Sequence, residues 1–335
     1  MALPTIEKTW QFKPNIMIPS TGDEHTNTKK MILALKNALT TFESNPWVVT
    51  GSSNKTTAGM DGVDRWNTID DIQWGTAGSV AHSWIVLKQT GIFSNFEICI
   101  DFGYSYSTRY IGFVIGLSGF TGGSTLNRPT ATTQIVLDNN NDYWYPNVAD
   151  NIMLQIMQST DGECTRIVYL TQRIPGLFWL FDKPKNPVSG WTNPFIVAFR
   201  TGSSIGNLST QCRLDIYNDN AILTSYMNSV TSKLYLATEG FGSATTLENF
   251  SSINQISNEY DIYPISLVSE TTGAKGRHGQ IYDLWFGDIS AANLGSYVDT
   301  TYPDDSTRQF WQCDDFIFPW NGTPSVPGTI PLVGF

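Results

Sequence analysis

FEICIDF, residues 96–102, is the stretch of this sequence that decides the fold class. Apolar side chains occupy every second position, and a glutamate, a cysteine and an aspartate stand between them. A period of two places successive side chains on opposite faces of a β-strand. We therefore expect a strand here that is buried on one face.

The same kind of segment recurs along the chain, between loops rich in Gly, Ser, Thr and Asn. It predicts further strands at Ser83–Lys88, Tyr110–Leu117, Gln134–Leu137, Met153–Met157, Arg166–Thr171, Leu177–Asp182, Phe195–Arg200, Arg213–Tyr217 and Gln280–Phe286. Many short strands separated by turn signals are typical of all-β domains. The predicted fold is mainly β: an antiparallel β-sandwich or jelly-roll-like core with one N-terminal helix and extended terminal arms.

Residues 27–43 predict the helix. Apolar residues recur at helical spacing at Met31, Leu35, Ala38, Leu39 and Phe42, and Lys29, Lys30, Lys36 and Asn37 lie elsewhere on the helical wheel. Thr26 and Thr28 offer capping hydroxyls, and Asn45-Pro46 marks the end. We expect this helix to pack on a sheet as a structural element.

Both ends of the chain predict extended arms. Residues 1–24 contain three prolines that break any helix, and residues 319–335 contain four prolines and no charged residue. Between them we expect a β-rich core over 25–318, which divides into two subdomains near 118–130 in one interpretation. The predicted interface residues of the arms are Trp10, Phe12, Ile16, Ile18, Pro319, Trp320, Pro327, Leu332 and Phe335.

The composition favours contact with other macromolecules. Only 15% of the 335 residues are charged, against about 25% in an average soluble domain, whereas 13% are aromatic. Surfaces made of Tyr, Trp, Asn and Ser suit broad protein contacts. The net charge of -10 argues against general binding to nucleic acid, which needs a basic surface.

The sequence contains no sign of export, membrane insertion or a disulfide framework. The first residues lack the apolar core of a signal peptide, and no apolar run approaches the roughly 20 residues that span a bilayer. The four cysteines, Cys99, Cys164, Cys212 and Cys313, are far apart. We expect buried thiols at these positions, because disulfide scaffolds and metal sites have denser spacing.

Candidate catalytic groups are sparse, and no catalytic residue or cofactor is predicted. A triad of Ser83, His278 and Asp283 is conceivable, but the chain has no Gly-x-Ser-x-Gly elbow, no HExxH motif and no phosphate-binding loop. Acidic pairs occur at Asp70-Asp71, Asp304-Asp305 and Asp314-Asp315. Adjacent aspartates on a strand point to opposite faces, so none of these pairs alone supplies the facing carboxylates of a glycosidase.

Residues 138–145, DNNNDYWY, combine a polar turn with three aromatic residues. Oxygen side chains at alternate positions resemble the start of a calcium loop, but Tyr143 replaces the turn glycine and Ala149 the bidentate glutamate. We interpret the acidic part as a polar turn and predict no metal site, with a looser calcium site as the alternative. Tyr143, Trp144 and Tyr145 are the candidate platform for stacking on a glycan.

Three groups of residues resemble stretches of tailed-bacteriophage structural proteins. They are DGECTR (161–166) with FDKP (181–184) and NPVSGW (186–191); GRHG (276–279) with YDLW (282–285); and YPDD (302–305) with Phe310 and FPWNG (318–322). Together they cover roughly the C-terminal half. The resemblance implies a place on the virion, leaves head, neck, baseplate and fibre open, and carries over no catalytic residue.

We therefore expect a non-enzymatic structural subunit of a virion that is assembled in the host cytoplasm. Its expected partners are further copies of itself and other virion proteins, without nucleic acid or membrane. Two alternatives stay open. One is a carbohydrate- or receptor-binding tail module with host-surface glycan as its partner, and the other is a polysaccharide depolymerase.

Overall fold

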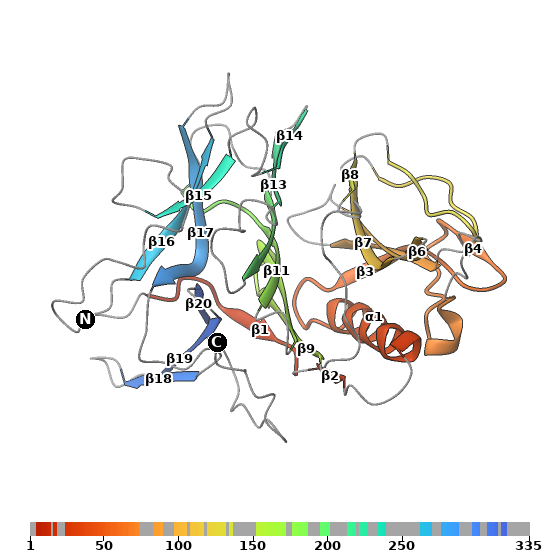
Figure 1. Ribbon diagram of the computed structural model, residues 1–335, viewed down its shortest axis with the longest axis horizontal. Helices are drawn as coiled ribbons and strands as arrows, with labels where there is room; N and C mark the ends of the chain where they lie inside the picture. Colours follow the sequence, from red (N-terminus) through yellow and green to blue (C-terminus); the bar gives the residue numbers. More distant parts are fainter. Residues whose placement is uncertain are drawn as a thin grey trace. The chain divides into compact units, whose positions relative to one another are not determined.

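The computed structural model describes residues 5–14, 16–18, 24–73, 83–89, 97–105, 108–116, 119–131, 134–136, 152–171, 176–186, 195–201, 213–218, 221–226, 234–238, 262–269, 276–287, 297–301, 307–313 and 316–319. Across these residues the chain is mainly β, with antiparallel strands and one α-helix (Figure 1). The predicted fold class is confirmed at this level. The arrangement as a sandwich or jelly roll stays a prediction.

The chain divides into two compact units. Unit 1 comprises Met1–Phe12 and Cys164–Phe335, and unit 2 comprises Lys13–Glu163. Unit 1 is therefore discontinuous in sequence, because all of unit 2 lies between its two parts. The range 118–130, where the sequence places a subdomain boundary, lies within unit 2.

Unit 2 contains a six-stranded antiparallel sheet with the strand order β4-β3-β5-β6-β7-β8. Its strands are β3 (Trp47–Ser53), β4 (Ala58–Gly59), β5 (Ser83–Gln89), β6 (Glu97–Ser105), β7 (Thr108–Gly116) and β8 (Gln134–Val136). Apart from this sheet, β2 (Ile16–Ile18) pairs with β9 (Ile152–Ser159). The strands predicted in this part of the sequence are all present as β5 to β9.

The middle of this sheet is buried on both faces, so the expectation of a half-buried strand at 96–102 was wrong. Ile98, Cys99 and Ile100 point alternately to the two faces, yet each is 0% exposed. Residues 119–131 provide the reason, because they return over the Cys99 face. There the backbone N–H of Phe120 donates to Glu97 Oε2 over 2.9 Å, and this bond satisfies a buried carboxylate.

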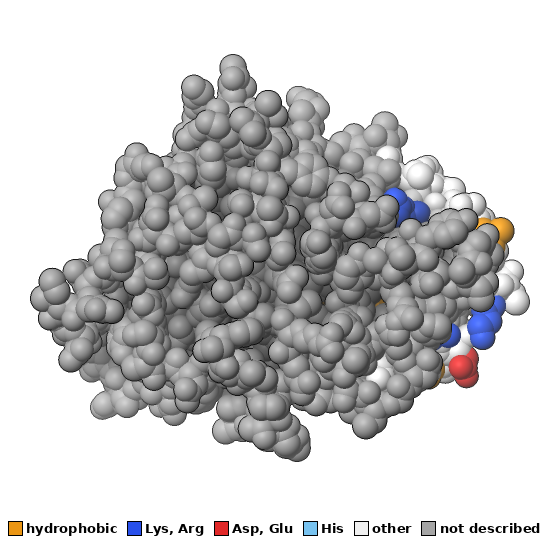
Figure 2. Space-filling view, viewed as in Figure 1, with side chains coloured by type: hydrophobic (Ala, Val, Ile, Leu, Met, Phe, Trp, Pro, Cys, Tyr) orange, Lys and Arg blue, Asp and Glu red, His pale blue; other side chains and the backbone are white. Residues whose placement is uncertain are grey.

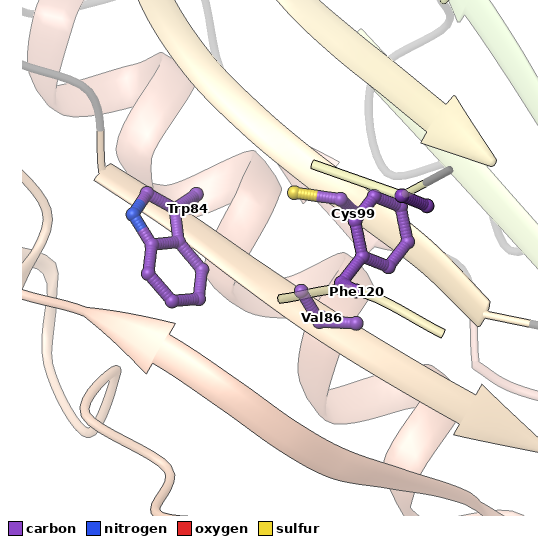
Figure 3. Packing of buried hydrophobic residues seen from close by; sticks show 5 residues of the cluster. Trp84, Val86, Cys99 and Phe120 are labelled. Carbon is purple, nitrogen blue, oxygen red and sulfur yellow. The ribbon is translucent and has the colours of Figure 1, made fainter. Parts of the chain in front are cut away.

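The covered face carries a hydrophobic cluster, formed by Trp84, Val86, Cys99, Phe120 and Ala131. Figure 3 shows Val86 and Cys99, which come from the neighbouring strands β5 and β6, beside the ring of Phe120. Trp84 lies further along β5, and its indole N–H donates to the carbonyl oxygen of Ser124 over 2.8 Å. Residues 119–131 are therefore held over the sheet by both packing and a hydrogen bond.

The predicted helix is α1 (Glu24–Thr40), which begins and ends earlier in the sequence than the expected range 27–43. The apolar positions Met31, Leu35, Ala38 and Leu39 are buried, as is Phe42 beyond the helix end. α1 contacts β2, β3 and β9. In the described part of the chain, no helix is long and apolar enough to cross a membrane.

Lys36 departs from the expected helical wheel, because it is only 5% exposed. Its ammonium lies 2.7 Å from Asp64 Oδ2 and donates to the carbonyl oxygen of Trp66 over 2.8 Å. A buried charge is tolerated when it is paired and hydrogen-bonded. α1 is thus joined to the loop after β4 by a polar contact as well as by its apolar face.

Unit 1 contains two groups of antiparallel strands. In the first, β10 (Cys164–Thr171), β11 (Gly176–Asp182), β12 (Phe195–Thr201), β13 (Arg213–Asn218) and β14 (Ala221–Tyr226) pair in chain order. The second has the order β15-β16-β17-β20-β19-β18 and comprises β15 (Leu234–Thr238), β16 (Ile262–Ser269), β17 (Gly276–Gly287), β18 (Tyr297–Thr301), β19 (Thr307–Cys313) and β20 (Phe316–Pro319). The strands predicted in this part of the sequence are present as β10 to β13 and β17.

A short bridge joins the two groups where the site described below is built. Lys185, just beyond the end of β11, exchanges two backbone hydrogen bonds of 2.8 Å with Gln280 of β17. The bridge fixes the end of β11 beside the middle of β17. Residues from both sheets of unit 1 can therefore contact one another there.

Cys99 and Cys164 are buried thiols outside any disulfide, as the sequence predicts. The side chains of Cys212 and Cys313 lie outside the described part of the chain. On the face that Figure 2 shows, coloured hydrophobic side chains are few and lie among basic, acidic and neutral ones. The exposed large hydrophobic side chains among the described residues are Val48, Val63 and Leu126.

Candidate interaction site

The site lies in unit 1, where Asp283 of β17 binds the N-terminal segment, residues 5–12. Asp283 Oδ1 accepts the backbone N–H of Glu7 over 2.8 Å. Its Oδ2 accepts the backbone N–H of Lys8 and the indole N–H of Trp10, each over 2.9 Å. A carboxylate that accepts three N–H groups makes charge-assisted bonds, which are stronger than neutral ones. Figure 1 shows the segment, in red, passing beside β17.

An irregularity in the β16–β17 ladder positions this carboxylate. Ser266 of β16 pairs with Gln280 and Pro264 pairs with Trp285, so one residue of β16 stands opposite four of β17. Within this bulge Asp283 adopts a φ of 45°, a left-handed conformation in which aspartate is enriched among non-glycine residues. Bulges redirect side chains, and here the bulge directs a buried carboxylate at the N-terminal segment.

Arg166 of β10 contacts both Trp10 of the segment and the backbone of Asp283. Its guanidinium lies 4.5 Å from the centre of the Trp10 ring, within the range of a cation–π contact. The same group donates to the carbonyl oxygen of Asp283 over 3.0 Å and to that of Tyr282. Arg166 therefore stacks on the ring of Trp10 and also hydrogen-bonds the backbone beside the carboxylate of Asp283.

Asp182 at the end of β11 neutralises Arg166. Arg166 stands opposite Leu180 in the β10–β11 register, so Asp182 is its diagonal neighbour on the same face. Arg166 Nη2 and Nε donate to Asp182 Oδ2 over 2.8 and 3.2 Å, and the two side chains are 1% and 0% exposed. Among the described residues, Asp182 Oδ1 has no hydrogen-bond partner.

Burial is the main cause of an altered proton affinity at Asp182. Loss of hydration raises the pKa of its carboxyl from 3.8 to about 6, and Asp283 acts in the same direction. The positive charges of Arg166 and Lys8 oppose this increase. Asp182 therefore binds a proton near pH 6, much more readily than an ordinary aspartate.

Two further contacts flank the segment. Lys8 Nζ lies 4.2 Å from the centre of the Tyr282 ring, and Lys185 Nζ forms an ion pair with Glu7 Oε1. The segment is thus bound by Arg166, Lys185, Tyr282 and Asp283, and Asp182 pairs with Arg166. We call these five residues the clamp. The clamp contacts the backbone, one aromatic side chain and both neighbouring charges of the segment.

The structure places the predicted interface residues in different parts of the fold. Trp10 and Phe12 form the ends of β1 (Trp10–Phe12) in unit 1, and Trp10 enters the clamp. Ile16 and Ile18 form the ends of β2 in unit 2, and Pro319 ends β20. The other predicted site residues, Trp320, Pro327, Leu332, Phe335, Tyr143, Trp144 and Tyr145, lie outside the described residues.

Two residues of the conceivable triad have structural partners. The carboxylate of Asp283 accepts the three donors of the N-terminal segment, and Ser83 Oγ accepts the backbone N–H of Gln73. Sequence reasoning considered Asp283 for chemistry and missed its role as an acceptor. Its partner Glu7 lies 276 residues away, so no local pattern could reveal the contact.

Acidic residues of unit 2 serve local folding. Asp71 Oδ2 accepts the backbone N–H of Asn67 and of Thr68 at the start of η1 (Ile69–Asp71). Asp61 pairs with Arg65 over 2.5 Å, and this contact lowers the pKa of Asp61 to about 2. Within the described residues, His, Cys, Asp and Glu nowhere gather in a group that could hold a metal ion. The polar turn at 138–142 lies outside that part of the chain.

No model of a known protein family matches this chain, and no curated protein matches it either. The role of the site therefore has to be inferred from its own contacts. The hydrogen bonds to Asp283, the ion pair of Lys185 with Glu7 and the stacking on Arg166 all hold the N-terminal segment. Such an arrangement is suited to binding.

Proposed function

We propose that this chain is a non-enzymatic structural subunit of a tailed-bacteriophage particle and that its terminal segments form contacts within the assembly. The observation that carries the proposal is the clamp. The buried Arg166 and the buried carboxylate of Asp283 hold Glu7, Lys8 and Trp10 of the N-terminal segment, and the buried Asp182 pairs with Arg166. Burying an unpaired charge destabilises a folded protein. The buried charges of the clamp are therefore tolerated only because each is paired or hydrogen-bonded.

The rest of the chain is consistent with this role. The low content of charge and the high content of aromatic residues suit large protein interfaces. In unit 2 the centre of the sheet is buried on both faces, which gives a rigid base for such contacts. The C-terminal half resembles virion structural proteins in the three groups of residues quoted above, and this resemblance supplies the class of assembly.

The proposal is tested on particles that have been purified through a density gradient from lysates of the source host. Mass spectrometry of the particle fraction should find this chain in many copies, and antibody–gold electron microscopy should label one defined location. Label confined to the tail tip, together with glycan binding, would favour the receptor-binding alternative. Absence of the chain from washed particles would overturn the proposal.

A further inference from the structure

We propose that residues 5–10 form a strap that closes onto the clamp as a separate last step of folding, and that this strap reopens in the native protein while the rest of the chain stays folded. The carboxylate of Asp283 is the group that holds the strap closed. The inference goes beyond the proposed function, because it concerns a conformational change of the chain itself and applies to the free chain as well as to one in a particle.

The clamp is built by contacts that do not include the strap. Arg166 of β10 pairs with Asp182 of β11 and donates to the carbonyl oxygen of Asp283 in β17. Lys185, just beyond the end of β11, is fixed to β17 by its two backbone hydrogen bonds with Gln280. These contacts join the three strands to one another. The clamp can therefore form first and receive the strap as a prepared site.

The strap itself buries little apolar surface. Every second residue from position 5 to position 9 is exposed, and the residues between them and Trp10 are half-buried. The strap is held mainly by polar groups, namely the three hydrogen bonds to Asp283 and the ion pair of Glu7 with Lys185. Segments with few buried apolar contacts open locally at a lower free energy than the core of a domain. We therefore expect the strap to open without global unfolding.

The chain that follows the strap is held independently of the clamp. β1, which begins at Trp10, is itself paired into a sheet. The backbone N–H of Lys13 donates to the carbonyl oxygen of Ile156 over 2.9 Å, and Lys13 Nζ donates to that of Thr41 over 2.5 Å. These contacts do not depend on Asp283. Opening therefore frees the chain only as far as Trp10, and the strap stays tethered at that end.

The sequence separation between the strap and its acceptor determines when the strap closes. Asp283 lies 276 residues after Glu7, and all of unit 2 lies between them. At typical rates of synthesis, Asp283 is added on the order of tens of seconds after Glu7. Closing so long a loop early would also be opposed by the conformational entropy of the intervening chain. Once that chain has folded, closure orders only the strap itself.

Hydrogen exchange of the full chain, followed by mass spectrometry at several low urea concentrations, tests the reopening. The amides of Glu7 and Lys8 should be protected, because they donate to Asp283. They should nevertheless exchange at least about a hundredfold faster than the protected amides of β5 and β6, and with little dependence on urea, as in a local opening. Exchange of the strap and of β5 and β6 at one rate with one urea dependence would overturn the proposal, and so would a complete lack of protection at Glu7 and Lys8.

Asp283→Asn should speed exchange in the strap several-fold and leave β5 and β6 unchanged, whereas the control Asp70→Asn should change neither. Equal acceleration in the strap and in β5 and β6 would contradict a local role of Asp283.

Pulsed hydrogen exchange during refolding of the unmodified chain tests the order of closure and needs no variant. Protection of the strap amides should appear after protection of β17. Protection of the strap together with β17, or before it, would contradict a separate last step. Particle localisation tests the proposed function independently of both results.

Discussion

The indole of Trp10 lies over the guanidinium of Arg166, with the ring centre 4.5 Å from the guanidinium carbon. The indole N–H simultaneously donates to Asp283, whose carbonyl oxygen accepts from the same guanidinium. Trp10 of the N-terminal segment, Arg166 of β10 and Asp283 of β17 thereby form a closed network in which each residue contacts the other two. This network gives the N-terminal segment a defined place in unit 1.

Trp10→Ala should lower the free energy of unfolding by about 2–3 kcal/mol. The substitution removes the stacking on Arg166, the hydrogen bond to Asp283 and the apolar area of a half-buried indole. Trp10→Phe keeps a ring over Arg166 and should cost less. Denaturant titrations measure these changes. Thr9→Ala, at an exposed neighbouring position, is the matched control and should change stability by less than about 0.5 kcal/mol. Equal effects at positions 9 and 10 would contradict this prediction.

Asp283→Asn should make the N-terminal segment accessible to trypsin at Lys8. The asparagine side chain has an NH₂ group in place of one of the two oxygens that accept the three N–H donors. At least one of these donors therefore loses its partner. Cleavage should be several-fold faster than in the unmodified chain, as followed by mass spectrometry over time. Asp70→Asn, at an exposed position of η1, is the control for loss of one negative charge. An unchanged cleavage rate in Asp283→Asn would show that the carboxylate does not hold the segment.

Asp182 should make stability depend on pH in a specific direction. Because burial raises its folded-state pKa from 3.8 to about 6, the folded protein binds this proton more tightly than the unfolded chain does. The resulting stabilisation is fully present below pH 3.8 and is lost as the pH rises through about 6. From the size of the shift it amounts to about 3 kcal/mol.

Asp182→Asn removes this titrating carboxyl group. Comparison of the variant with the unmodified chain therefore separates the titration of Asp182 from those of the other acidic groups. The neighbours that face Asp182 are Arg166 from β10, Asp283 from β17 and Lys8 from the N-terminal segment, and all of them stay in the variant. The difference in unfolding free energy between the unmodified chain and the variant should shift in favour of the variant between pH 4 and pH 7. Denaturant titrations at several pH values measure it. Parallel pH profiles would contradict the assignment.

Gly123→Ala should destabilise the loop that covers the Cys99 face of the sheet. A Cβ at this position would lie 2.6 Å from Trp84 Cζ2, and Gly123 has a φ of +93°. We expect a loss of about 2–4 kcal/mol from the clash and the backbone strain together. Gly122→Ala is the matched control, because its φ of +76° is also left-handed but no atom lies within 4 Å of the added Cβ. Thermal unfolding of both variants tests whether the contact with Trp84 matters beyond the backbone conformation.

A chain that ends at Pro319 should fold but fail to enter particles. Pro319 stands opposite Phe310 in the β19–β20 ladder, so the truncation is placed after this residue to preserve the sheet. The proline-rich residues 320–335 are the proposed C-terminal contact segment. Circular dichroism tests the fold, and mass spectrometry of purified particles tests incorporation. Normal incorporation of the truncated chain would rule out a required role for this segment.

The elements that could be predicted from the sequence are those whose pattern is local. β5, β6 and α1 follow from periods of two and of about 3.6 residues, and the buried positions of α1 follow from the same spacing. β16 and β20 are among the strands that were not predicted. Each contains a proline, Pro264 or Pro319, a residue that is disfavoured inside a sheet. Pro264 is tolerated at the edge of the bulge, where the ladder is already irregular.

The clamp could not be predicted, because its contacts join distant residues. Trp10 was expected to be an anchor of an arm, but neither Arg166 nor Asp283 carries a local signal that points to it. The burial of Lys36 could not be predicted for the same reason. Its burial depends on Asp64, which lies 28 residues further along the chain. Periodicity predicts which face of an element is apolar, whereas buried charges depend on partners that only the folded chain brings together.

The incorporation of clamp variants into particles tests most directly whether the clamp acts in assembly. Asp283→Asn and the control Asp70→Asn are each supplied as the sole copy during infection, and their content in purified particles is measured by quantitative mass spectrometry. We expect normal incorporation of Asp70→Asn and a loss of at least about tenfold for Asp283→Asn, although both variants fold. Incorporation of folded Asp283→Asn at the level of the control would contradict a role for the clamp in assembly.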